Sequence, residues 1–132
     1  MKRILLILAL LPLASAAAAV TPIEGRWQNP KDSVIIDVAP CGAGTLCGRV
    51  SWASPRAKAD ARKGGTQRLI GTRLLSGLKP NGEGGWKGRA YLPKRNMHAT
   101  ALVHAAGGRT MVVKGCLVGG LVCKEQRWTR VN

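Results

Sequence analysis

The chain has 132 residues, of which 45% are hydrophobic, and 21 Lys and Arg against six Asp and Glu give it a formal net charge of +15 at pH 7. The hydrophobic share excludes a chain that is disordered throughout, and the length fits one domain with a modest core. Seventeen Gly and no Phe favour short strands joined by tight turns over long helices.

The N-terminal segment predicts export from the cytoplasm. Lys2 and Arg3 precede an apolar run over residues 4–13, and the small residues 14–19 offer several cleavage sites of the A-x-A type. The apolar run is shorter than the ~20 residues that a membrane-spanning helix needs. We therefore expect a signal peptide at 1–19, cleaved somewhere in 16–20, and one periplasmic or secreted domain at 20–132 without a transmembrane anchor.

The first half of this domain predicts three strands, at residues 24–28, 33–38 and 46–53. Alternating apolar residues give each of the last two an inward face, made of Val34, Ile36 and Val38 in one strand and of Leu46, Val50 and Trp52 in the other. Residues 54–67 are polar and basic, and they predict either a long loop or a short surface helix.

The second half predicts five further strands, at residues 68–76, 86–92, 97–104, 110–116 and 125–131. The strand at 97–104 alternates most strictly, with Met97, Ala99, Ala101 and Val103 on one face. Together the pattern predicts an all-β fold with little helix, in which a small antiparallel meander of eight strands closes into a barrel. The interior of such a barrel is either filled by side chains or able to hold one small ligand.

Four cysteines, Cys41, Cys47, Cys116 and Cys123, predict two disulfides in an exported domain of this size. Three pairings are possible. We favour Cys41–Cys47 and Cys116–Cys123, because each pair brackets a short glycine-containing turn that suits a hairpin. Neither spacing is C-x2-C, so the sequence favours neither a zinc site nor thiol redox catalysis.

The sequence contains few residues that could act as catalytic acids, bases or nucleophiles. His98 and His104 share a strand face but stand about 20 Å apart at the rise of a strand, so they cannot share one metal ion. The six carboxylates are dispersed, and none of the common nucleophile, metal or phosphate motifs occurs. We expect no enzymatic activity, no metal and no cofactor.

Export also decides how the charge is interpreted. Cleavage of the signal peptide leaves a net charge of +13, because it removes two basic residues and no acidic one. The basic residues are scattered without interleaved aromatic residues, so nucleic acid is not an expected partner. The polyanions outside the cytoplasm are lipid headgroups, lipopolysaccharide and acidic proteins. The alternative is a basic surface that only keeps the protein soluble.

The aromatic residues are the candidate ligand site: Trp27, Trp52, Trp86, Tyr91 and Trp128. A barrel can bring several of them together around an apolar cavity, and the small inward side chains of residues 97–103 would leave room for a ligand. The alternative is that the indole rings fill the core, since no Phe is present to do so.

Several segments carry a resemblance to known proteins. Gly25-Arg26-Trp27 resembles the G-x-W opening of lipocalin-type barrels. A wider set is similar, in this order, to the exported bacterial family named domain of unknown function 2147: residues 25–27, 41–42 with 46–50, 71 with 74–78, 85–93, 113–116 and 128–130. The resemblance implies a lipocalin-like barrel without an established activity. It also implies a structural role for Arg130, packed across Trp27.

The function that we expect is the binding of a small apolar or amphipathic ligand in or at the barrel, near Trp27, Trp52 and Trp86. The alternative is an envelope protein-interaction or inhibitor module that uses the basic residues 56–68 against an acidic partner or lipopolysaccharide. Salt separates the two, because electrostatic association weakens with ionic strength and apolar binding barely responds.

Overall fold

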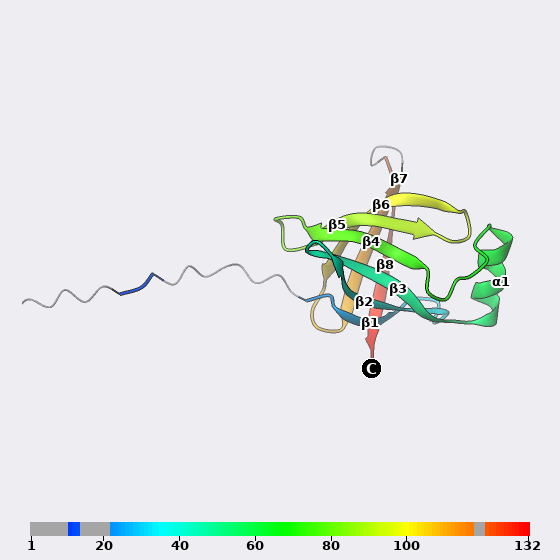
Figure 1. Ribbon diagram of the computed structural model, residues 1–132, viewed down its shortest axis with the longest axis horizontal. Coiled ribbons are helices and arrows are strands. Elements are labelled where there is room, and N and C mark those ends of the chain that lie inside the picture. The colour runs from blue at the N-terminus through cyan, green and yellow to red at the C-terminus, as the bar shows by residue number, and fades with distance from the viewer. Residues whose placement is uncertain (1–10, 14–21, 118–120) are drawn as a thin grey trace, which may run out of the picture.

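Eight antiparallel strands form a closed barrel in the computed structural model, which describes residues 11–13, 22–117 and 121–132 (Figure 1). The predicted signal peptide lies, apart from residues 11–13, outside the described residues, as does the Gly119-Gly120 turn. In the described part of the chain, no helix is long and apolar enough to span a membrane.

The strands follow one another around the barrel in sequence order: β1 (Gly25–Gln28), β2 (Val34–Gly42), β3 (Thr45–Ala53), β4 (Arg73–Pro80), β5 (Trp86–Leu92), β6 (Met97–Ala105), β7 (Thr110–Leu117) and β8 (Val122–Val131). β1 pairs with β2 on one side and β8 on the other, which closes the sheet. The predicted all-β meander is therefore confirmed.

A single helix, α1 (Pro55–Lys63), connects β3 to β4, so residues 54–67 contain the short surface helix rather than only a loop. The start of the helix is determined by the local sequence. The side chain of Ser54 accepts a hydrogen bond from the backbone N–H of Ala57 at 3.1 Å, and Pro55 occupies the first turn, where no N–H is needed. Arg62 and Lys63 in the last turn suit the negative end of the helix dipole.

The inward side chains fill the barrel. Trp27, Ile36 and Leu78 are fully buried, and the small inward side chain of Ala101 also has no exposed surface. A Cβ added at Gly48 would lie 3.1 Å from the Cδ1 atom of Ile36, which shows how closely β2 and β3 pack there. The core is thus a contiguous cluster of buried apolar residues drawn from all eight strands.

The expected inward face of β3 is wrong at one residue. Leu46 and Val50 are buried, but the side chain of Trp52 is 43% exposed. Ile35 pairs with Trp52 while Ile36 pairs with Val50, so Ser51 is an extra residue on β3. This β-bulge reverses the alternation and turns Trp52 to the outside.

One end of the barrel is closed by Arg130. Its guanidinium carbon lies 4.2 Å from the centroid of the Trp27 ring, and its Nε and Nη1 atoms donate to the carbonyls of Gly108 and Glu24, each at 2.9 Å. The expected packing of Arg130 across Trp27 is present. Gly25 leaves the space for it, because an added Cβ there would lie 2.4 Å from Nη1.

The two disulfides join Cys41 to Cys47 and Cys116 to Cys123, as favoured from the spacing. They lie in different surroundings. Cys47 is 4% exposed and belongs to the wall of the barrel, whereas Cys123 is exposed on a hairpin. The first bridge therefore constrains a packed region and the second a solvated one.

Replacing Arg130 by Ala should lower the free energy of unfolding by about 2–4 kcal/mol, because a stacked cation and two charged hydrogen bonds are lost together. Urea unfolding followed by tryptophan fluorescence measures this. The exposed Arg127, on the same strand, is the control, and Arg127→Ala should change stability by less than about 0.5 kcal/mol. Equal stability of the two variants would contradict the closing role of Arg130.

Removing the Cys41–Cys47 bridge with a double Ala substitution should cost about 2 kcal/mol or more, since a short loop is released and a buried sulfur is lost. The same change at Cys116 and Cys123 should reduce the global unfolding free energy less and mainly increase hydrogen exchange in residues 114–125. Thermal unfolding and hydrogen-exchange mass spectrometry separate these outcomes.

Candidate functional site

Two hollows lie on the outer surface of the described domain. The first, here called the basic hollow, has a volume of about 230 Å³ and is lined by Lys58, Arg62, Gln67, Arg68, Leu69 and Ile70. The second, here called the disulfide hollow, has a volume of about 290 Å³ and is lined by Asp37, Ala39, Pro40, Cys41, Cys47, Arg49, Val50, Ser51 and Gly71. Both are slightly smaller than a typical pocket for a drug-sized ligand.

The basic hollow combines positive charge with apolar surface. Lys58 and Arg62 are four residues apart, so they share one face of α1. Arg68 comes from the segment that leads to β4, where Leu69 is buried and the side chain of Ile70 is 45% exposed. Three cations and no carboxylate line this hollow, a composition that suits an anionic group attached to an apolar part.

The carboxylate on α1 does not cancel this charge. Asp60 lies two residues from both Lys58 and Arg62, so it projects from nearly the opposite side of the helix. Its Oδ2 atom lies 3.9 Å from the Nζ atom of Lys94 and 4.0 Å from the Nε atom of Arg56. The carboxylate is therefore engaged by two other cations, neither of which lines the basic hollow.

Two contacts hold α1 beside the β5–β6 turn (Figure 1). The hydroxyl of Thr66 lies 2.7 Å from the hydroxyl of Tyr91 and donates to the carbonyl of Pro93 at 2.9 Å. Gly64 passes so close to the turn that a Cβ there would lie 2.1 Å from the carbonyl oxygen of Lys94. The wall of the basic hollow that α1 provides is thus fixed to the barrel.

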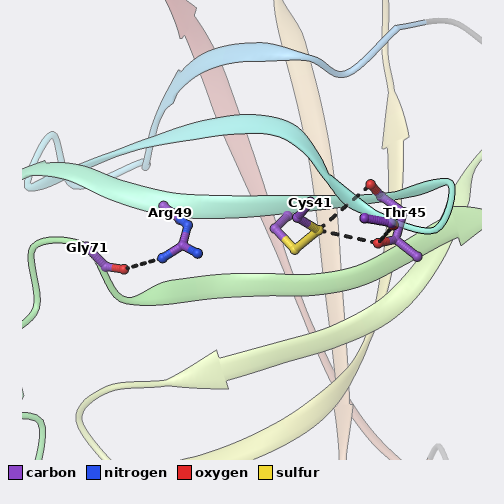
Figure 2. Close-up of a disulfide and its surroundings, with 6 residues drawn as sticks. Cys41, Thr45, Arg49 and Gly71 are labelled. Atoms are coloured by element: carbon purple, nitrogen blue, oxygen red, sulfur yellow. Dashed lines mark hydrogen bonds between the residues drawn. A yellow bond between two sulfur atoms is a disulfide. The ribbon is translucent and has the colours of Figure 1, made fainter.

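The disulfide hollow has balanced charge. The guanidinium of Arg49 donates to the carbonyl of Gly71 at 3.3 Å, and Figure 2 shows this contact along the strand from the bridge that contains Cys41. Asp37 accepts from the Nε atom of Arg26 at 3.2 Å and from the hydroxyl of Ser51 at 3.3 Å. Since the carboxylate of Asp37 and the guanidinium of Arg49 are already engaged in these contacts, the disulfide hollow favours neither a cationic nor an anionic ligand.

The five aromatic candidates do not form one site. Trp27 and Trp128 are buried in the core, and Trp86 packs against it partly buried. Trp52 faces outward because of the bulge, and the hydroxyl of Tyr91 is used by Thr66 and by Asn96 at 2.8 Å. None of the five lines either hollow. A ligand role for them stays a prediction.

Four of the residues that line the basic hollow, from Lys58 to Arg68, were expected only as part of the basic segment 56–68. Leu69 and Ile70 were expected in the strand at 68–76, which begins at Arg73 instead. A finer signal was present in the sequence: Ser54-Pro55 marks a helix start, and Lys58 and Arg62 at i and i+4 then share a face. The contribution of Leu69 and Ile70 had no such signal, because it depends on how the chain returns to the barrel after α1.

The candidates for acid–base or metal chemistry stay apart. His98 and His104 are both exposed on β6. Within residues 11–13, 22–117 and 121–132, no three His, Cys, Asp or Glu side chains are grouped so that they could hold a metal ion.

Comparison with known proteins identifies a family and a similar fold. Residues 25–130 match the family described as "Uncharacterized protein conserved in bacteria (DUF2147)". The chain belongs to this family. A solved structure, described as "Protein HP1028 from the human pathogen Helicobacter pylori belongs to the lipocalin family", is similar with a TM-score of 0.65 and 15% identity over 84% of each chain. At this identity the likeness shows a shared lipocalin-like fold. No curated protein matches the chain.

Replacing Thr66 by Val should release α1 from the barrel, because the isosteric side chain cannot bond to Tyr91 or Pro93. We expect a loss of about 1–3 kcal/mol in unfolding free energy and faster hydrogen exchange in residues 55–66. Thr66→Ser keeps the hydroxyl and is the control. Unchanged exchange in the Val variant would show that these bonds do not hold the helix.

Proposed function

We propose that this protein is an exported binding protein whose ligand is a small amphipathic molecule with an anionic head group, held in the basic hollow. The observation that carries the proposal is the lining of that hollow: three cationic side chains, no carboxylate, and Leu69 and Ile70 beside them. The likeness to a lipocalin-family structure supports ligand binding in general.

Packing favours the outside of the barrel over its interior for this ligand. The inward positions of the strands are taken by the buried cluster around Trp27, Ile36 and Leu78. A ligand placed among them would have to displace well-packed apolar side chains, which costs more than binding to an open hollow. The basic hollow needs no such rearrangement, since α1 is already held in place by Thr66 and Gly64.

The proposal includes export and excludes catalysis. The N-terminal segment has the layout of a signal peptide, and two disulfides are typical of proteins in oxidising compartments. The lining of the basic hollow offers cations and an amide but no general base or nucleophile, so it suits binding and not bond cleavage.

Octyl phosphate is a suitable probe, because it joins an anionic head to a short apolar chain. Its dissociation constant, measured by NMR titration of the mature protein, should rise about tenfold or more in Arg62→Ala/Arg68→Ala, which loses two charged hydrogen-bond donors. Raising the salt concentration should also weaken binding. Octyl glucoside, with a neutral head, should bind much more weakly.

The matched control is Arg56→Ala/Lys63→Ala. It removes the same charge from the same segment, but neither residue lines the basic hollow. It should raise the dissociation constant less than about threefold, the size of a general field effect. Equal losses in the two double variants would reject the hollow as the site. Native mass spectrometry of protein extracted gently from its own envelope would then identify the natural ligand.

A further inference from the structure

On its β8 side, the β7–β8 hairpin extends beyond the closure of the barrel, while β7 stays paired with β6 as far as Cys116. β8 pairs with β1 only through Thr129, Arg130 and Val131, so its residues before Thr129 pair with β7 alone. In a barrel wall alternate residues are buried, yet all six residues of β8 from Val122 to Arg127 are exposed. We call residues 114–117 and 121–127 the arm. Figure 1 shows β7 and β8 rising beyond the other strands.

The arm carries two highly exposed apolar side chains on β8 and just before it. The side chains of Leu121 and Val122 are 85% and 61% exposed, the largest exposed fractions among large apolar residues of the described domain. The sequence carries no charge between Lys114 and Lys124. Neighbouring apolar side chains with this degree of exposure favour a contact surface.

Cationic side chains lie on the arm between these apolar residues and the rest of the barrel. Lys114, Lys124 and Arg127 are exposed on the arm, against the single carboxylate of Glu125. Lys124 follows Leu121 by three residues, about 10 Å along a strand. This is about the depth to which apolar side chains enter the boundary between lipid headgroups and acyl chains. The Cys116–Cys123 bridge, in register across the two strands, holds the arm in one shape before it binds.

The connections at the two ends of the barrel also differ in charge. In a closed meander the connections after β1, β3, β5 and β7 share one end of the barrel. The first three of these connections, residues 29–33, 54–72 and 93–96, carry eight Lys and Arg against two Asp. The connections at the other end, residues 22–24, 43–44, 81–85 and 106–109, carry one Arg against two Glu. An anionic surface therefore attracts the end from which the arm projects.

We propose that the arm docks this protein on an anionic lipid surface, with Leu121 and Val122 inserted among the headgroups and Lys114 and Lys124 beside the phosphates. A lipid surface fits better than an acidic protein, because exposed apolar side chains next to cationic ones match the boundary between acyl chains and anionic headgroups. The inference is independent of the basic hollow, whose lining residues are all outside the arm.

Co-sedimentation with vesicles tests the docking. The mature protein with both disulfides formed is mixed with vesicles of phosphatidylcholine that contain phosphatidylglycerol, or with phosphatidylcholine alone. We expect binding to the anionic vesicles, and a partition coefficient at least about tenfold lower for Leu121→Asp/Val122→Asp, which places two charges where apolar side chains enter the bilayer. Leu121→Ala/Val122→Ala should be intermediate. Circular dichroism checks that each variant is folded.

The matched control is Ala43→Asp/Ala106→Asp, which makes the same change in net charge at two exposed positions of the opposite end. It should keep most of the binding. Equal losses in both Asp variants would overturn the proposal in favour of unspecific attraction, and equal binding of wild type and the arm variant would overturn it outright.

Binding of polyglutamate, a model for an acidic protein, is measured with the same variants. Loss of polyglutamate binding in the arm variant, with vesicle binding unchanged, would assign the arm to an acidic protein instead. In all cases octyl phosphate titration of the arm variant reports separately on the basic hollow.

Discussion

Closure of the barrel depends on β1, a strand of four residues that pairs with β2 on one side and β8 on the other. Such a short strand supplies few ladder hydrogen bonds, so contacts of the surrounding side chains are needed to hold β1 between β2 and β8. Trp27 is fully buried, and its indole N–H donates to the carbonyl of Ile23 at 2.8 Å. Arg130 covers the ring and ties β8 to the chain before β1 and to the β6–β7 turn. The loss of this cluster would reopen the sheet along its first and last strands.

The shortness of β1 also explains why the two ends of the barrel differ. At the end held by Arg130, β8 is paired on both sides. Toward the other end β1 stops at Gln28, so the rest of β8 has one partner and extends as the arm. That same end carries α1 and the basic hollow. One end is thus a rigid closure, and the other presents cationic and apolar side chains to the surroundings.

The alternation of apolar residues was sufficient to predict eight strands, and G-x-W with a late arginine was sufficient for the contact between Trp27 and Arg130. The errors have local physical causes. The bulge at Ser51 inserts one residue without any change in composition, so periodicity could not show that Trp52 faces outward. β8 begins at Val122 and not near residue 125, because alternation marks a strand only where one of its faces is buried. The basic hollow depends on contacts of Thr66 and Gly64 with a turn some 30 residues later, which no local pattern contains.

A filled interior changes what a lipocalin-like fold can do with a ligand. A barrel with a cavity encloses an apolar molecule and needs little from its surface charge. Here Trp27, Trp128 and Met111 occupy the inside, and the basic hollow lies on the outside, lined by α1 and by three cations. Under the proposed function, recognition would rely on the head group of the ligand more than on its apolar part, and binding would weaken with salt. The arm and α1 follow strands of the same end of the barrel but point in different directions (Figure 1), so docking by the arm would bring the protein close to the layer in which anionic amphiphiles are concentrated without turning the hollow toward it. Under the two proposals, the excess of positive charge, which has no use in the packing of the core, would serve both steps.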